Sequence, residues 1–165
     1  MANQRGAGAH PRLESMSNVR QASDVQHMFG FIARRYDLMN RLMTFGQDLK
    51  WRQEVIRQAQ PFTGGRLLDL GAGTGDLARE AIRQCPGCQV VAADFTLPMV
   101  YVGRRRVRPG SLVWVAADAL HLPFPDQSFD TVISAFLLRN VFDLPRSLSE
   151  QFRVLRPGGR IVALD

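Results

Sequence analysis

Three glycines at alternate positions follow a short apolar run in the first half of the chain. The run is Leu67-Leu68-Asp69-Leu70, and Gly71, Gly73 and Gly75 come directly after it. An apolar run that opens into such a loop predicts a buried strand turning sharply into a helix, because glycine permits the backbone conformations of a tight turn. The bare backbone of this turn can lie against a flat polar molecule that a side chain would obstruct.

The spacing of this loop and its acidic residues select among the ligands that such a turn binds. The pattern D-x-G-x-G-x-G differs from the dinucleotide fingerprint G-x-G-x-x-G, and it lacks the Gly-Lys-Ser/Thr ending of a phosphate loop. Asp69 and Asp76 bracket the loop. Two carboxylates disfavour a pyrophosphate but suit a ligand that carries an ammonium and a sulfonium group. The loop therefore favours S-adenosylmethionine as cofactor, and methyl transfer over hydride or phosphoryl transfer.

Acidic residues also end the next two predicted strands. Asp94 ends the strand at 89–94, about 20 residues after the loop, where a carboxylate accepts hydrogen bonds from ribose hydroxyls. Asp118-Ala119 follows the strand at 112–117, and a carboxylate there can accept a hydrogen bond from the exocyclic amine of adenine. Acids at three successive strand ends of one βαβαβ run indicate a nucleoside site.

Strand and helix patterns alternate along the rest of the chain. We expect strands near 66–70, 89–94, 112–117, 129–136 and 159–165, and helices near 76–84, 97–107 and 144–155. Strands separated by helices of this length pair in parallel through right-handed crossovers. The predicted class is α/β: a Rossmann-like methyltransferase fold with a mostly parallel sheet and helices on both faces.

Three segments make up the expected domain organisation. Residues 1–23 read as a disordered tail, 24–62 as a helical lid over the substrate, and 63–165 as the cofactor-binding domain. Asp48 is expected to cap the last helix of the lid. Because the chain stops inside an apolar strand, we expect the last strands of the sheet to be absent.

The basic balance of the chain is a weak indicator of partners. The formal net charge is +6, but Lys50 is the single lysine, and so strong a preference for arginine resembles a codon bias. We therefore expect no nucleic acid partner, and we interpret Arg104-Arg105-Arg106 as a solvated helix end. No apolar run approaches the ~18 residues of a membrane helix, so we expect a cytoplasmic protein, with contact at the membrane surface left open.

The cysteines and histidines predict neither redox chemistry nor a metal site. Cys85-Pro86-Gly87-Cys88 closes a predicted helix, whereas a reactive C-x-x-C opens one, where the dipole lowers the thiol pKa. A zinc site of this type needs a second cysteine pair. The three histidines share no ligand spacing, so no metal is expected.

Three blocks resemble the ubiquinone/menaquinone biosynthesis C-methyltransferase family. They are Tyr36-Asp37-Leu38-Met39-Asn40 with Met43-Thr44 and Trp51 after it, Arg139-Asn140-Val141, and Arg153-Val154-Leu155-Arg156-Pro157-Gly158-Gly159. The chain departs from the family pattern at four positions. Thr44 replaces Ser, Asp48 replaces His, Leu137 replaces Gly, and Asp165 replaces Glu.

The resemblance implies methylation of a ring carbon of a polyprenyl quinol. It assigns cofactor contacts to Thr74, Asp94 and Asp118-Ala119, with the glycine loop supplying the rest. It places Arg139, Asn140 and Tyr36 around the ring. A guanidinium stays protonated, so we assign Arg139 stabilisation of a developing phenolate rather than the role of a base. The alternatives are a core aromatic role for Tyr36 and a surface ion pair for Arg139.

Other functions and partners remain open on the sequence. A small-molecule O-methyltransferase is the enzymatic alternative, and a SAM-binding module without turnover is the non-enzymatic one. The Asn/Asp-Pro-Pro-aromatic turn typical of N-methyltransferases on nucleic acid or protein is replaced by Ser134-Ala135-Phe136-Leu137-Leu138. The apolar segment 28–45 is expected either to cover the sheet or to meet a bilayer, and a homodimer is left open.

Overall fold

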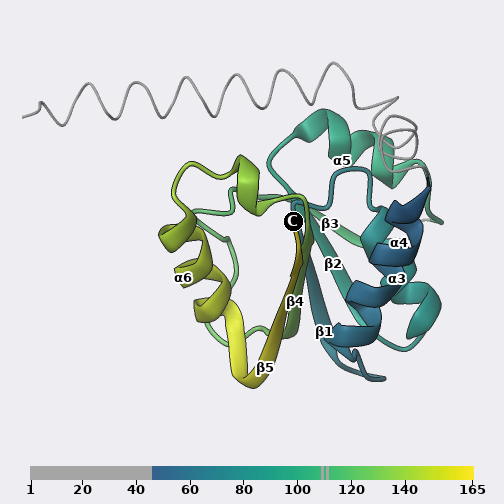
Figure 1. Ribbon diagram of the computed structural model, residues 1–165, viewed down its shortest axis with the longest axis horizontal. Coiled ribbons are helices and arrows are strands. Elements are labelled where there is room, and N and C mark those ends of the chain that lie inside the picture. Colours follow the sequence, from purple (N-terminus) through teal and green to yellow (C-terminus); the bar gives the residue numbers. More distant parts are fainter. Residues whose placement is uncertain (1–45, 109, 111) are drawn as a thin grey trace, which may run out of the picture.

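The computed structural model describes residues 46–108, 110 and 112–165, which form a sheet covered by helices (Figure 1). The described strands pair in the order β3-β2-β1-β4-β5, and every neighbouring pair is parallel. Their bounds are β1 (Arg66–Leu70), β2 (Gln89–Asp94), β3 (Val113–Ala116), β4 (Phe129–Ala135) and β5 (Leu155–Leu164). The strand order reverses between β1 and β4, and a crevice at their carboxyl ends is where ligands bind in such sheets.

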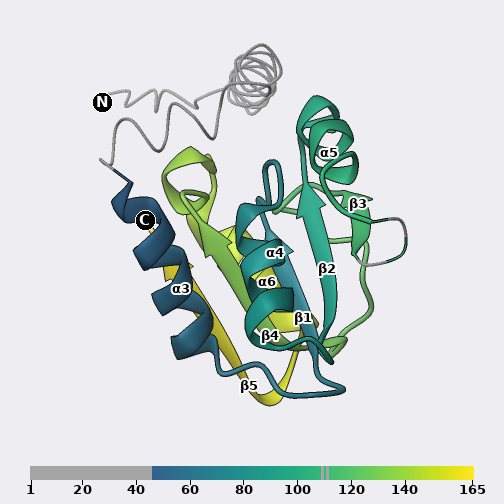
Figure 2. The same cartoon turned by 90° about the vertical axis from the view of Figure 1, so that its right-hand side faces the viewer.

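Helices cover both faces of this sheet. One face carries α3 (Gln47–Ala59), α4 (Asp76–Gln84) and α5 (Leu97–Arg104), and the other carries α6 (Leu144–Val154) (Figures 1 and 2). The short 3-10 helix η1 (Leu138–Asn140) connects β4 to α6. Within the described ranges, no helix has the length and apolar character needed to cross a bilayer.

Successive side chains of β1 point to opposite faces of the sheet and contribute to two core layers, one on each face. Leu67 packs with Ile56 of α3, whereas Leu68 packs on the opposite face with Phe129 and Val154. All five side chains are fully buried. A central parallel strand is covered on both faces, which is why its sequence reads as a continuous apolar run.

The predicted α/β class with a parallel sheet and helices on both faces is confirmed. The bounds of β1, β2 and α4 agree with the sequence prediction, whereas β5 begins at Leu155, before the expected residue 159. Leu155 already pairs with Phe129, after which the register shifts. Gly158, with a left-handed φ of 78°, lies within this irregular part of the strand.

The prediction that Asp48 caps a helix is wrong. α3 begins after Gly46, whose φ is 77°, and within the described residues no side chain caps it. Asp48 lies instead in the first turn and is buried, with its Oδ2 3.6 Å from Arg52 Nε. The other end of α3 is fixed to the sheet, because Arg160 of β5 donates to the Gln58 carbonyl at 2.9 Å.

The expected tail at 1–23, Tyr36 and the apolar segment 28–45 lie outside the described residues. The predicted domain boundary between 62 and 63 stays a prediction, because residues 24–45 of the expected lid lie outside the described residues.

Candidate functional site

The glycine loop leaves β1 at the switch point and is fixed to the neighbouring strand. The N–H groups of Gly71 and Ala72 both donate to the carbonyl of Ala93, at 2.8 and 3.0 Å. Gly71, Gly73 and Gly75 have φ values of 69°, 57° and 84°. These angles lie in the left-handed region, where a side chain is strained, so the loop needs glycine for conformation alone.

Packing adds a second requirement at two of these glycines. A Cβ on Gly71 would lie 2.9 Å from Leu137 Cδ1, and a Cβ on Gly75 would lie 2.6 Å from the ring of Trp114. The loop therefore passes between Leu137, which precedes η1, and Trp114 of β3. At Gly75 the missing side chain makes room for the protein's own tryptophan.

Asp94 connects β2 to this loop. Its Oδ2 accepts a hydrogen bond from the Gly73 N–H, and its Oδ1 accepts one from the Thr96 N–H, both at 2.7 Å. The residue is only 8% exposed, and burial raises the pKa of Asp94 although both N–H donors oppose the shift. The carboxylate is held at the pocket wall by the backbone on either side.

Asp118 follows β3 and begins a loop of its own. Its Oδ1 accepts a hydrogen bond from the Leu120 N–H at 2.9 Å, and its Oδ2 lies 3.8 Å from His121 Nδ1. Asp118 and Ala119 both line the pocket.

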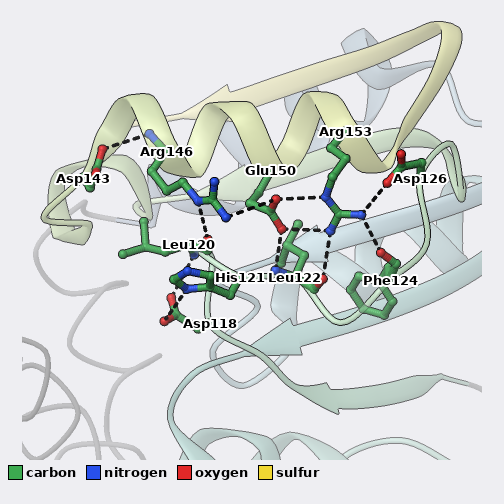
Figure 3. Close-up of polar contacts among 10 residues, drawn as sticks. All are labelled: Asp118, Leu120, His121, Leu122, Phe124, Asp126, Asp143, Arg146, Glu150 and Arg153. Carbon is green, nitrogen blue, oxygen red and sulfur yellow. Dashed lines mark hydrogen bonds and ion pairs between the residues drawn. The ribbon is translucent and has the colours of Figure 1, made fainter.

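Charged side chains of α6 hold this second loop (Figure 3). Arg146 donates to the Leu120 carbonyl at 3.0 Å, and Glu150 accepts a hydrogen bond from the Leu122 N–H at 2.8 Å. Arg153 donates to the Leu122 carbonyl at 2.9 Å and to Glu150 at 2.8 and 2.9 Å. These Arg153 bonds lower the pKa of Glu150 to about 2. The helix thereby positions the loop that presents Asp118.

An open pocket lies between the two loops and the end of β4. Three of its described lining residues are charged, namely Arg52, Asp94 and Asp118. The rest of the wall is mostly apolar and aromatic: Leu70, Phe95, Met99, Leu120, Phe136, Leu137, Val141 and Phe142. A cleft with an apolar wall and a few placed polar groups suits a small organic ligand.

The pocket brings together six of the residues named from the sequence: Gly71, Gly73, Asp94, Asp118, Ala119 and Asn140. Asp69, Thr74, Gly75 and Arg139 do not line it. Thr74 and Gly75 belong to the part of the loop nearer α4, and the Thr74 carbonyl accepts a hydrogen bond from Arg79 Nη1 at 2.8 Å.

Asp69 lies beneath the loop on the α3 face of β1. It is 1% exposed, and within the described chain neither carboxylate oxygen has a partner in hydrogen-bonding geometry. Burial raises the pKa of Asp69 to about 7, although the charge of Arg52 and the nearby Ala78 N–H oppose the shift. Asp69 therefore interacts electrostatically with Arg52, which lines the pocket, but does not line the pocket itself.

η1 carries the two residues of the Arg-Asn pair. Asn140 lines the pocket, and its Nδ2 donates to the Phe136 carbonyl at 2.7 Å. Arg139 is half exposed, its guanidinium lies 5.3 Å over the Phe136 ring, and its Nε pairs with Asp165. Phe136 has a φ of 59°, an uncommon value for a non-glycine residue. The ring-contact roles of Arg139 and Asn140 stay predictions.

Sequence reasoning missed Arg52 and the aromatic wall. Arg52 occupies a buried position of α3 four residues after Asp48, with Val55 and Ile56 on the same buried side. The sequence signal that could have revealed Arg52 was a pair of charged residues, Asp48 and Arg52, on the otherwise apolar face of this helix. The aromatic wall of Phe95, Phe136 and Phe142 had none, because these residues come from three separate loops.

The two cysteines lie at the C-terminal end of α4 and in the turn after it. Cys85 ends α4, and both thiols are free. Burial raises the pKa of Cys88 to about 11, which favours the protonated thiol at neutral pH.

Comparisons with known proteins agree with this geometry. Residues 16–165 match the model of the ubiE/COQ5 methyltransferase family. The chain is 49% identical over 140 residues to the demethylmenaquinone methyltransferase of Thermus thermophilus, covering 84% of this chain and 64% of that protein. It is 45% identical to the ubiquinone/menaquinone biosynthesis C-methyltransferase UbiE of Desulfotalea psychrophila, covering 86% and 57%. The chain thus spans about 60% of the length of these relatives.

One of the solved structures that this chain resembles is a methyltransferase with S-adenosylhomocysteine bound. The fold matches Haemonchus contortus phosphoethanolamine N-methyltransferase 2 in complex with phosphomonomethylethanolamine and S-adenosylhomocysteine, with a TM-score of 0.64 and 30% identity. The match covers 69% of this chain and 27% of that one. The chain therefore belongs to the ubiE/COQ5 methyltransferase family, whose members use S-adenosylmethionine as methyl donor.

Proposed function

We propose that this protein methylates a ring carbon of a polyprenyl quinol. The reaction would convert demethylmenaquinol to menaquinol, or would act on the equivalent benzoquinol of ubiquinone synthesis. One observation carries the proposal: a single pocket joins the acidic strand ends to an aromatic wall. Asp94 and Asp118 line this pocket and would form its nucleoside side, whereas Phe136, Asn140 and Phe142, which also line it, would surround the acceptor ring.

The residues on the nucleoside side fit S-adenosylmethionine. Two N–H donors fix the Asp94 carboxylate, and its remaining lone pairs suit ribose hydroxyls. Asp118 and Ala119 suit the adenine edge. When bound, the cofactor supplies an electrophilic methyl group. Charge and hydrogen bonds would hold it, and Gly71 and Gly73, which line the pocket, present no side chain to it.

The acceptor side fits an aromatic ring with two hydroxyl groups. Phe136 and Phe142 provide apolar surface for the ring. Asn140 Nδ2 donates to the Phe136 carbonyl, which fixes the direction of its Oδ1. This oxygen is therefore suited to accept a hydrogen bond from a quinol hydroxyl. Asn140 and Tyr36 would then orient the ring oxygens.

Arg139 is suited to stabilise the phenolate that makes the ring carbon nucleophilic. A guanidinium carries a permanent positive charge, so Arg139 would act by charge while water accepts the phenol proton. Arg139 does not itself line the pocket, but its guanidinium lies over the ring of Phe136, which does, and Asp165 occupies its Nε, so the Nη side would face a phenolate. Correct placement of the two reacting atoms would supply much of the remaining acceleration.

A polyprenyl tail is too apolar to reach a protein through water, so we propose that the acceptor is taken up at a bilayer surface. The apolar segment 28–45, with Arg34, Arg35 and Arg41, is the expected contact. Arginines near an anionic surface contribute about 1 kcal/mol each. Salt-sensitive sedimentation with anionic liposomes tests this contact.

The test of the reaction uses the purified chain with S-adenosylmethionine and a short-tailed demethylmenaquinol kept reduced. Mass spectrometry with fragmentation identifies whether the new methyl is on carbon or oxygen. A C-methylated product supports the proposal, and an O-methylated product supports the O-methyltransferase alternative. Calorimetric binding of S-adenosylhomocysteine without any product, on naphthoquinols and benzoquinols alike, would support a binding module instead.

A further inference from the structure

We propose that Arg52 of α3 binds the carboxylate of the methionine part of S-adenosylmethionine. The proposal rests on the cofactor and not on the identity of the methyl acceptor.

The first argument is the environment of the guanidinium. Arg52 is 7% exposed, yet it lines the pocket. Among the described residues, its Nε has no hydrogen-bond partner, and Asp48 Oδ2 lies beyond hydrogen-bond reach at 3.6 Å. A buried charge with an unmet donor is costly unless a ligand accepts a hydrogen bond from that donor. A bound carboxylate provides that completion, because it matches the planar donor fork of arginine.

The second argument is the charge of the pocket. Of the charged side chains that line its described wall, Arg52 is the cation, and Asp94 and Asp118 are the acids. The cofactor carries one carboxylate, and the two acids are suited to its sugar and base. The carboxylate is repelled at both acidic positions and attracted at Arg52.

The third argument is the order of these groups along the sheet. Asp118 follows β3, Asp94 ends β2, and Arg52 interacts electrostatically with Asp69 of β1, in a sheet ordered β3-β2-β1-β4. The parts of the cofactor follow the same order: adenine, ribose, then methionine. Gly71 and Gly73, in the loop that follows β1, also line the pocket.

Two buried acids that do not line the pocket lie near the guanidinium of Arg52. Asp48 lies one helical turn before Arg52, and Asp69 lies beneath the loop. Both attract the guanidinium, but neither accepts a hydrogen bond from its Nε. We therefore describe Asp48 and Asp69 as positioning residues and Arg52 as the binding residue.

The experiment compares two ligands by isothermal titration calorimetry. S-adenosylhomocysteine carries the carboxylate, and 5′-methylthioadenosine has the same nucleoside and thioether without it. Arg52→Gln should weaken S-adenosylhomocysteine by about 10- to 100-fold, the range for a hydrogen bond to a charged group. It should leave 5′-methylthioadenosine within about twofold. Arg57→Gln is the matched control, because Arg57 is an exposed arginine of the same helix, paired with Glu54, and should change neither affinity.

Several outcomes would overturn the proposal. An equal loss for both ligands would mean that Arg52 only supports the fold, and no loss would mean that the carboxylate is bound elsewhere. If Arg52→Gln fails to fold because Asp48 is left buried and charged, the double variant Asp48→Asn/Arg52→Gln removes that charge and repeats the comparison. A wild-type chain that binds neither ligand would overturn the cofactor assignment itself, which is a different failure from an unaffected Arg52→Gln variant.

Discussion

Asp94 Oδ2 lies 2.7 Å from the backbone nitrogen of Gly73, and this hydrogen bond fastens the glycine loop to the carboxyl end of β2. The carboxylate that is expected to hold the ribose therefore also shapes the loop beside it. Its second oxygen is fixed by the Thr96 N–H at the same distance. If Asp94 binds the ribose as expected, this one side chain couples loop conformation to ligand binding.

Asp94→Ala should weaken S-adenosylhomocysteine by about 1.5–3 kcal/mol, because it removes hydrogen bonds to a charged acceptor. It should also loosen the loop, which hydrogen exchange at the Gly73 and Thr96 amides would detect. Calorimetry measures the affinity, and Glu54→Gln at an exposed position of α3 is the control. Unchanged affinity would mean that the ribose is bound by another group.

Gly75→Ala should destabilise the chain more than Gly64→Ala. Both glycines have nearly the same φ, 84° and 83°, so both variants carry the same backbone strain of about 1–2 kcal/mol. Gly64 has open space around its Cβ position, whereas a Cβ on Gly75 meets Trp114 at 2.6 Å. Urea denaturation of the two variants separates strain from this clash, and equal losses would show that Trp114 moves aside freely.

The central strands were predictable because each is a local apolar pattern. β1 and β2 were predicted at their observed bounds, and the acids at their ends followed from the same pattern. Contacts between distant segments could not be predicted in this way. The approach of Trp114 to Gly75, the pairing of Arg139 with Asp165, and the position of Arg52 at the pocket all depend on how whole elements pack. Asp48 was misread because its spacing fits a cap, yet Gly46 starts the helix.

Glu150→Gln should lower the free energy of unfolding by about 1–3 kcal/mol near neutral pH, since it weakens charge-assisted bonds to Arg153 and to the Leu122 N–H. The folded-state pKa of Glu150 is about 2, below its ordinary value of 4.5. Its contribution is therefore complete above about pH 4.5 and is lost as pH falls toward 2. Urea denaturation from pH 7 to pH 3 should show the wild-type advantage shrinking. A constant difference across this range would contradict the role of the charge.

Asp69→Asn should have the opposite pH dependence. The folded-state pKa of Asp69 is about 7, above its ordinary value of 3.8, so the folded chain binds the proton more tightly than the unfolded chain does. The contribution of Asp69 to the free energy of unfolding is therefore greatest below about pH 4 and falls as pH rises toward 7. Because asparagine does not titrate, the variant should gain stability relative to wild type over this range. Parallel pH profiles for the two proteins would show that Asp69 does not titrate there.

Arg139→Lys should lower methyl transfer strongly while leaving the affinity for S-adenosylhomocysteine nearly unchanged. Lysine keeps the charge but loses the planar fork that can reach Asp165 and a phenolate together. Asp165→Asn is the discriminating control, because it removes the ion pair and leaves the guanidinium in place. Single-turnover rates with a reduced quinol and calorimetry with S-adenosylhomocysteine should be measured on both variants. A much larger rate loss in Arg139→Lys than in Asp165→Asn supports a direct role at the ring. Equal losses would assign Arg139 to holding η1 through Asp165, and a collapse of cofactor affinity would assign it to the cofactor side of the pocket.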